Sequence, residues 1–310
     1  MGMSAAQAGD NLAAAEELWR HSDPASTPMW KFLQQVNKNH GVRLNGYPDL
    51  YKWSVENVAE FWHETWQFVG IKASTPYDQV LPPNAPMYPR PDFFGSARLN
   101  FAENLLFPPA DPAIDPASTA VITTTELPGD LRSTTWAELR EAVRRCANGL
   151  RASGLKPHDV VAGYVSNHVE ALVAMLSAAS IGAIWTGISP DNGVSAVLDR
   201  LSQIAPKVLF ADNGTVYNGK EWSSTSKTTE IVGELKKAGL QTVIVINNIK
   251  GELGMSDLEA HGVKAVEYAS LNNYPPLTRS TFSTPVARPV FPRPLYTLLS
   301  AHFCSTRRNT

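Results

Sequence analysis

Between residues 156 and 248 the sequence alternates short β-branched runs with amphipathic helical segments, and this alternation constrains the fold more than any other feature. Strand patterns occupy residues 120–125, 160–166, 184–189, 207–212 and 242–247, with a weaker one at 264–268, and helical periodicity occupies residues 135–153, 169–181, 194–204 and 229–238. Strands alternating with helices of this length predict right-handed βαβ units and a doubly wound, mostly parallel sheet covered on both faces. Such sheets bind ligands beyond the carboxyl ends of their strands, which here are residues 166–168, 189–191 and 212–214.

The sequence before this alternation predicts a helical, loop-rich lead over residues 1–110. Thr27 and Pro28 suit the cap and the first position of a helix that stops at Gly41. We expect Ser54 to cap a second helix, one face of which carries Val58, Phe61, Trp62, Trp66 and Val69. Indoles at helical spacing favour a core over ligand stacking. Recurrent prolines over residues 81–112 predict an extended arm.

Composition and charge exclude several classes of protein. The chain has 310 residues, of which 43% are hydrophobic and 18% charged, so it can bury a sizeable core. Its net charge of −2, with cations scattered among acids, argues against nucleic-acid binding. The N-terminus lacks the pattern of a secretory signal, and Ala6 stands where myristoylation needs Ser or Thr.

The uncharged stretch over residues 171–190 meets the length of a membrane span. Its content of Ala, Ser and Gly, and the strand-and-turn signal at its end, favour a buried helix followed by a strand. We therefore expect no membrane span and a cytoplasmic protein.

The last segment differs in kind from the rest of the chain. After Glu267 there is no acidic residue, while five Arg and six Pro occur among the last 43 residues. This shift predicts a disordered tail, apart from a short strand pattern at residues 295–299. The expected organisation is thus a helical lead at 1–110, a partial α/β lobe at 111–274 and a tail at 275–310.

Two stretches carry a resemblance to a known family. The first is IWTGISPDNGVSAVLDRLSQIAPKVLF at residues 184–210, and the second is DFFGSARLNFAENLL at residues 92–106. With the aromatic lead from Leu18 to Trp66, they resemble adenylate-forming acyl-CoA synthetases, and among these the acetoacetyl-CoA synthetases. The resemblance implies an incomplete large domain of such an enzyme. It also implies an activity that joins acetoacetate, or another short carboxylic acid, to CoA with ATP and Mg²⁺.

The catalytic groups that the resemblance implies are a glycine-rich phosphate loop, acidic ligands for Mg²⁺ and ribose, and a lysine on a mobile C-terminal domain. All of them belong to the second half of the family, and residues 293–300 lie where the family runs into its phosphate loop. Residues 222–229 offer hydroxyls and a lysine but no glycine, which favours a solvated loop. The motifs GxGxxG, GxxxxGK[ST], HExxH, CxxC and GxSxG do not occur. We therefore assign no catalytic and no metal residue, leave the cofactor-binding residues open, and expect no productive binding of ATP, Mg²⁺ or CoA.

Several single residues invite a functional interpretation, but each has a structural alternative. His168 stands at the end of a strand, where a general base could reach a ligand, yet it also suits a helix cap. Asp191 suits the first turn of the following helix, and Asp199 with Arg200 suits an exposed ion pair. Cys146 shares a helical stripe with apolar residues and is expected to be a buried hydrophobe rather than a reactive thiol.

The leading hypothesis is a truncated acid–thiol ligase that is inactive alone. The alternatives are a non-catalytic module that binds or regulates, for instance by docking on the intact synthetase, and an incomplete gene model of a full enzyme. A lobe without its partner would expose apolar surface, so we expect self-association or association with chaperones.

Overall fold

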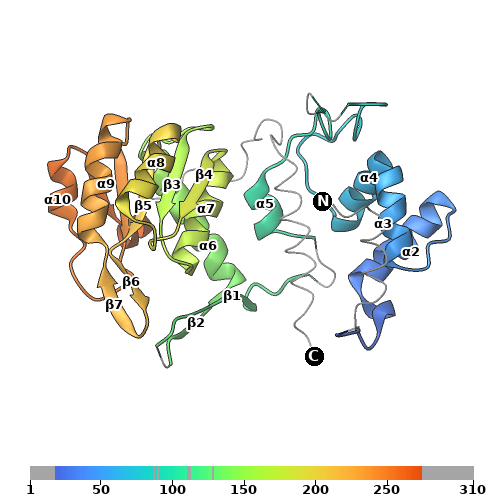
Figure 1. Cartoon of the computed structure of the whole chain (residues 1–310), viewed down its shortest axis with the longest axis horizontal. Helices are drawn as coiled ribbons and strands as arrows, with labels where there is room; N and C mark the ends of the chain where they lie inside the picture. Colours follow the sequence, from blue (N-terminus) through green and yellow to red (C-terminus); the bar gives the residue numbers. More distant parts are fainter. Residues whose placement is uncertain (1–17, 87, 89–90, 110–112, 128, 274–310) are drawn as a thin grey trace, which may run out of the picture. The chain divides into compact units, whose positions relative to one another are not determined.

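The structure, a computed structural model of the chain, describes residues 18–273 except 87, 89–90, 110–112 and 128. The expectations for the first 17 residues and for the tail at 275–310 lie outside the described residues. The chain divides into two compact units, residues 1–68 and 69–310, and each is described by itself (Figure 1). No helix in the described part of the chain is long and apolar enough to cross a membrane.

The first unit is helical. A short 3₁₀ turn, η1 (Pro24–Ser26), precedes α2 (Pro28–His40), α3 (Tyr47–Glu56) and α4 (Val58–Val69). The predicted start and stop of α2 are confirmed, because the Thr27 hydroxyl accepts a hydrogen bond from the Trp30 amide and Gly41 adopts a φ of 66°. The aromatic core is confirmed too: the buried residues here include Phe32, Leu33, Val36, Leu50, Trp53, Trp62 and Trp66.

The prediction that Ser54 caps a helix is wrong. Ser54 lies inside α3, and its hydroxyl donates to the Tyr51 carbonyl at 2.7 Å. The chain breaks instead at Asn57, whose side-chain amide donates to the Trp53 carbonyl at 3.0 Å. A serine can bond back to a carbonyl one turn earlier within a helix, so its presence alone does not mark a helix start.

A five-stranded parallel sheet forms the centre of the second unit, as predicted. It contains β3 (Val160–Tyr164), β4 (Ile184–Ile188), β5 (Val208–Asp212), β8 (Thr242–Ile246) and β9 (Lys264–Glu267). The spatial order is β4-β3-β5-β8-β9. Every neighbouring pair is parallel, with Val161 beside Trp185 on one side and Val208 on the other. Buried, continuous apolar runs are typical of strands covered on both faces.

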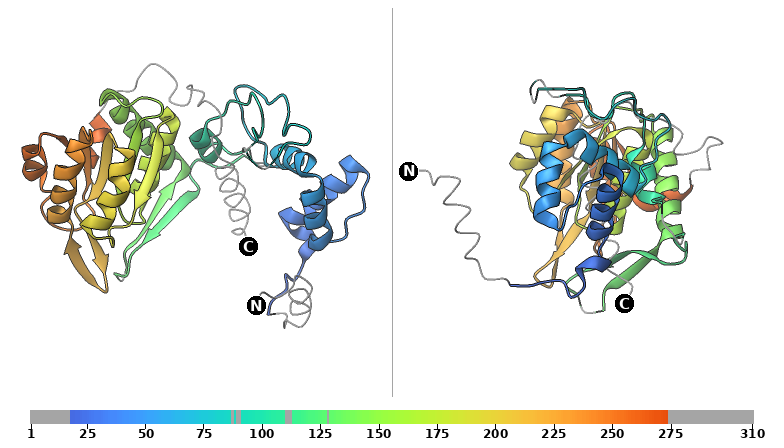
Figure 2. Two further views of the ribbon diagram at one scale, coloured as in Figure 1. Left: turned by 45° about the horizontal axis from the view of Figure 1, so that its top comes forward. Right: turned by 90° about the vertical axis from the view of Figure 1, so that its right-hand side faces the viewer.

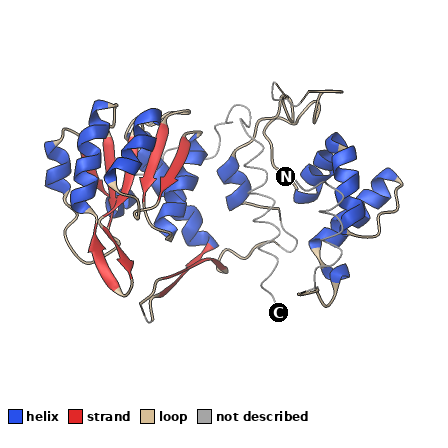
Figure 3. Ribbon diagram, viewed as in Figure 1, coloured by secondary structure: helices blue, strands red, loops and turns tan. Residues whose placement is uncertain are grey.

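Helices cover both faces of this sheet (Figure 3). One face packs against α6 (Trp136–Ala152) and α7 (Val169–Ile181), together with α5 (Phe101–Leu106) and the 3₁₀ helix η2 (Tyr268–Asn273). The other face packs against α8 (Val194–Ile204), α9 (Thr225–Lys237) and α10 (Met255–Ala260). The start of α6 is fixed by a capping box in which the Glu138 amide donates to the Thr135 hydroxyl and the Glu138 carboxylate accepts from the Thr135 amide.

The strand predicted at residues 120–125 does form, but it does not join the parallel sheet. As β1 (Thr119–Thr124) it pairs antiparallel with β2 (Leu131–Thr135) in a separate two-stranded ribbon. The connection is too short for a crossover helix, so the chain turns back on itself at Asp130, whose carbonyl accepts from the Thr125 amide.

The prediction of a solvated loop at residues 222–229 is also wrong. These residues end β7 (Lys220–Ser223), which pairs with β6 (Gly214–Tyr217), and begin α9 at Thr225. Thr225, Thr228 and Thr229 lie at the start of this helix, where the Thr229 hydroxyl donates to the Thr225 carbonyl at 3.0 Å.

Candidate functional site

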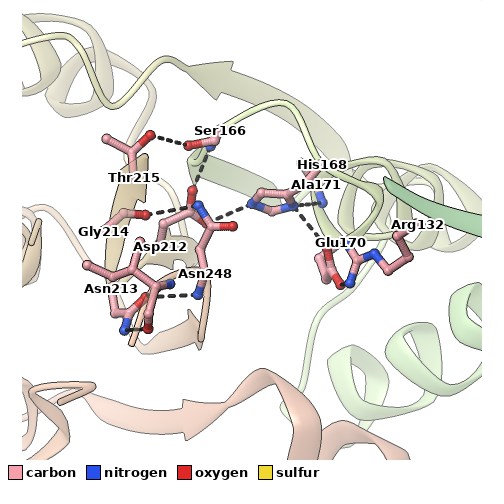
Figure 4. A network of polar contacts seen from close by, with 11 residues as sticks. Arg132, Ser166, His168, Glu170, Ala171, Asp212, Asn213, Gly214, Thr215 and Asn248 are labelled. Atoms are coloured by element: carbon pink, nitrogen blue, oxygen red, sulfur yellow. Dashed lines mark hydrogen bonds and ion pairs between the residues drawn. The ribbon is translucent and has the colours of Figure 1, made fainter. Parts of the chain in front are cut away.

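Polar side chains from the carboxyl ends of β3 and β5 meet at one point (Figure 4). His168 follows β3 and caps α7, while Asp212 is the last residue of β5. The Nε2 atom of His168 lies 2.9 Å from Oδ1 of Asp212, and both side chains are almost fully shielded from solvent. The sequence predicted that these strand ends share an edge of the sheet, and the structure brings the two residues into direct contact.

His168 occupies the N-cap position of α7, as the sequence predicted. Its Nδ1 atom lies 3.2 Å from the Ala171 amide and 3.2 Å from Oε2 of Glu170. One ring nitrogen cannot accept from the amide and donate to the carboxylate at once. The neutral ring caps the helix, whereas the imidazolium donates to Glu170 and to Asp212.

Charge decides between these two forms of His168. Burial alone would lower the pKa of His168, but hydrogen bonds and negative charge from Asp212 and Glu170 outweigh burial and raise the pKa to about 9. Burial would raise the pKa of Glu170, but His168 and Arg132 lower it to about 2. Arg132 forms two hydrogen bonds to Glu170, each 2.9 Å long. At neutral pH the group is therefore an alternating chain of cations and anions.

The Asp212 carboxylate also fixes the backbone beside it. Its Oδ2 atom accepts from the Ser166 amide at 2.7 Å, which holds the loop after β3 against the end of β5. The next residue, Asn213, accepts the amides of Asn248 and Ile249 at 2.8 and 3.1 Å and donates to the Ile249 carbonyl at 2.9 Å. These bonds join the ends of β3, β5 and β8 into one rigid edge.

This cluster is built for support rather than for nucleophilic catalysis. The Ser166 hydroxyl lies 3.3 Å from that of Thr215, and in the described part of the chain neither nitrogen of His168 bonds a hydroxyl. A nucleophile needs a base within hydrogen-bond reach, so the contacts offer no Ser/His/Asp arrangement. Within the described residues, no three His, Cys, Asp or Glu side chains form a metal site.

A cavity of about 770 Å³ lies beside the cluster. Its walls come from β1, from β4 and the loop after it, from α7 and from β6; His168, Leu172, Met175, Trp185 and Gly187 are among the lining residues. The side facing α7 is largely apolar, and polar groups gather at the end near Ser166. Figure 2 shows the β1–β2 ribbon beside β4.

The other residues singled out from the sequence lie apart from this cluster. Asp191 is exposed and lies before the cap of α8 rather than in its first turn; its Oδ2 atom accepts from the Ser189 hydroxyl at 3.0 Å. Asp199 and Arg200 are exposed, but the predicted ion pair is wrong: Arg200 donates to the Ala196 carbonyl at 2.8 Å. Adjacent residues on a helix point in different directions, so they do not face each other.

Cys146 is a buried residue, as its place among apolar residues on one face of the helix predicted. Its side chain is buried in the core that α6 and α7 share, and burial raises the pKa of its thiol to about 12. Arg132 and Glu170 were not anticipated as members of the polar cluster. The only signal was that Glu170 stands two positions after a candidate cap; the position of Arg132 follows from a ribbon that the sequence did not predict.

The fold defines a class: a doubly wound α/β lobe with a parallel sheet covered by helices on both faces. The sequence profile of the family described as AMP-binding enzyme matches residues 111–278, and that of the acetyl-coenzyme A synthetase N-terminus matches residues 47–105. The chain belongs to the AMP-binding enzyme family.

Comparison with individual proteins shows which members of that family the chain resembles. The chain is 50% identical over 236 residues to the malonamoyl-CoA synthetase vrtB of Penicillium aethiopicum, covering 76% of this chain and 32% of that protein. It is 40% identical over 237 residues to the acetoacetyl-CoA synthetase of Xenopus tropicalis, covering 76% and 34%.

A solved structure supports the same assignment. The acetoacetyl-CoA synthetase from Streptomyces lividans matches with a TM-score of 0.73 and 31% identity, covering 88% of this chain and 39% of that one. The chain thus spans about a third of the length of the curated relatives it matches. The resemblance to acetoacetyl-CoA synthetases is confirmed, as is the α/β fold.

Proposed function

We propose that this chain contributes the N-terminal lobe of an acid–thiol ligase whose acid is short and carries a carbonyl group at C3. The observation that carries the proposal is the similarity to two synthetases whose names specify malonamoyl-CoA and acetoacetyl-CoA. Malonamate and acetoacetate have the same carbon skeleton around the carboxylate and differ by an amino group in place of a methyl group. A lobe related to both enzymes therefore suits an acid of that shape.

The reaction we propose uses ATP to form an acyl-adenylate and then transfers the acyl group to CoA. Transition states of this kind need preorganised donors and cations around the developing negative charge. The described contacts place His168, Arg132 and Glu170 in a mutually neutralised cluster, so none of them is free for that role. We infer that the 310-residue chain holds and stiffens the lobe and does not complete the reaction alone.

Pyrophosphate release tests the second part of this proposal. The purified 310-residue chain is incubated with ATP, Mg²⁺, CoA and either malonamate or acetoacetate, and release is compared with a blank lacking the acid. We expect no release above the blank. Loss of one oxyanion-type donor already costs about 10² to 10³ in rate, and the sequence lacks the whole glycine-rich loop. Acid-dependent release would contradict the inference.

A chimera tests the first part. Residues 18–273 replace the matching segment of the Penicillium aethiopicum enzyme, and a second chimera uses the Xenopus tropicalis enzyme. We expect acid-dependent CoA thioester formation from both chimeras, with malonamate and acetoacetate as the acids. If a chimera is folded by circular dichroism and activates a straight-chain acid but neither of these two, the assignment of a C3 carbonyl is wrong.

A further inference from the structure

Five asparagines of the chain are followed directly by glycine, and the structure gives them different surroundings. They are Asn45, Asn148, Asn192, Asn213 and Asn218. In such a pair the glycine amide nitrogen can attack the asparagine side chain, because glycine has no side chain to hinder the approach. Two of the pairs are shielded. Asn148 is buried within α6, and Asn213 is buried and accepts the amides of Asn248 and Ile249.

Two further asparagines, Asn45 and Asn218, are exposed but have a carboxylate beside the reacting groups. The amide of Gly219, which follows Asn218, donates to Oε2 of Glu126 at 2.9 Å. The backbone and side-chain amides of Asn45 lie 2.9 and 3.4 Å from Oδ2 of Asp49. The attack requires the glycine nitrogen to lose its proton, and a nearby carboxylate opposes the negative charge that this loss creates. These two pairs should therefore react slowly although they are exposed.

Asn192 has the opposite surroundings. It lies in the loop between β4 and α8, and the exposed Gly193 after it is the N-cap of α8. In the described part of the chain the Gly193 amide donates to no partner, so its proton is free to leave. The main-chain carbonyl of Asn192 belongs to the same peptide bond and accepts from the Tyr164 hydroxyl at 2.9 Å. A peptide nitrogen without its proton shares its charge with that oxygen, so the hydroxyl stabilises the anion.

Two more features favour this anion. Tyr164 is fully buried, and burial together with the charge of Asp191 raises the pKa of its phenol, so the hydroxyl remains a donor. The same hydroxyl lies 3.0 Å from the Pro190 carbonyl, which holds it against the loop. The helix α8 begins at Val194 and has 11 residues, and the N-terminus of a helix favours negative charge beside it. The peptide bond that Asn192 shares with Gly193 thus lies between a buried donor and a helix N-terminus.

We propose that Asn192 is a site of spontaneous conversion to aspartate and isoaspartate through a cyclic imide. The Gly193 nitrogen bonds to Cγ of Asn192, the bond between Cγ and Nδ2 breaks, and the proton of the Gly193 amide leaves with Nδ2 as ammonia. Water then opens the ring at one of its two carbonyls. Opening at Cγ gives aspartate, whereas opening at the main-chain carbonyl gives isoaspartate, in which the backbone runs through the former side chain.

The modification changes the charge at the rim of the cavity described above. Either product adds a carboxylate next to Asp191, which lines the cavity, and the described lining residues include no Lys or Arg. Isoaspartate also lengthens the main chain just before the cap of α8. The charge of this rim, and the shape of the loop after β4, therefore depend on the age of the molecule.

Peptide mapping of the full chain by mass spectrometry, both folded and in urea, tests the proposal. In urea all five asparagines should react at similar rates, because each precedes glycine in an unfolded chain. In the folded chain Asn192 should react at least about 10-fold faster than the other four, which structure protects. Gly193→Ala should slow the reaction at Asn192 by hindering the attack. Alanine fits at this position, since φ is −71° and a Cβ atom would meet nothing within 4 Å.

Tyr164→Phe separates a chemical role of the hydroxyl from a mere loosening of the loop. Loss of the hydrogen bond should slow the reaction at Asn192 about 5-fold, whereas a loosened loop would accelerate it. Asn148 and Asn213 report on the fold and should stay slow in both variants, since both are buried. Two results overturn the proposal: Asn192 reacting as slowly as these buried asparagines in the folded chain, and a rate at Asn192 that Tyr164→Phe leaves unchanged or raises.

Discussion

Raising the pH removes the proton from His168, and this should destabilise the second unit of the chain. The folded pKa of about 9 lies above the ordinary value of 6.5, so the folded state holds the proton more tightly than the unfolded state. The stabilisation is therefore complete below pH 6.5 and is lost as the pH rises through about 9. At about 1.36 kcal/mol for each pH unit between the two pKa values, the loss is about 3 kcal/mol.

The lowered pKa of Glu170 adds no separate 3 kcal/mol to the free energy of unfolding. Its lowered pKa reflects partly the same contact with His168, and adding the two would count one interaction twice. Of a typical net stability of about 5 to 15 kcal/mol, about 3 kcal/mol is a measurable share.

Urea unfolding between pH 6 and pH 9.5 measures the effect. The probe is the NMR signals of the Leu209 and Phe210 amides in the folded state, so the measured stability is that of the second unit alone. His168→Asn is the matched control, because asparagine caps a helix well but does not titrate. We expect the free energy of unfolding to fall by about 3 kcal/mol more in the unaltered chain than in the control. Equal slopes for the two chains, or a titration midpoint of the His168 ring at or below 6.5, would refute the reasoning.

Two further predictions concern α6. Thr135→Ala should destabilise the second unit by about 1 kcal/mol because the capping box is lost, whereas Thr135→Ser should change the stability little. Urea unfolding compares the two variants, and equal stabilities would contradict the role of the cap. In a Cys304→Ser chain, a thiol reagent should modify Cys146 only as fast as the protein unfolds, because burial raises its pKa to about 12; rapid modification of the folded chain would show that the site is open.

The parallel sheet could be predicted because its strands carry a signal that is local. The runs from Val160 to Tyr164 and from Val208 to Asp212 are apolar, short and separated by helical periodicity, and the sequence predicted both within two residues. The helix Val169–Ile181 was predicted with the bounds that the structure has. Burial on both faces gives such strands a pattern that needs no knowledge of the partners.

Pairing could not be predicted in the same way. The residues of β1 look like those of the sheet strands, but a strand pattern does not specify which neighbour it finds. The short helices α3 and α5 were missed because few turns give little periodicity, and α5 depends on Asn100, which caps it and also donates to the Ser180 carbonyl at 3.1 Å.

The polar cluster was predictable in part. The sequence placed His168 and Asp212 at one edge of the sheet, since both follow strands of the same direction. It could not show that their side chains touch, because contact depends on the β3–β5 register and on the rotamers. Arg132 entered the cluster from a ribbon outside the sheet, so no argument from strand ends could include it.

The order of strands in the sheet bears on how the chain assembles while it is being synthesised. After β4 has paired with one side of β3, β5 pairs with the other side of β3, and then β8 joins β5 and β9 joins β8. Growth therefore proceeds outward in the direction of synthesis, and no late strand must insert between two early ones. Within the described residues β4 pairs with β3 alone, so from the moment that β4 emerges its other side is open to pairing with a neighbouring nascent chain.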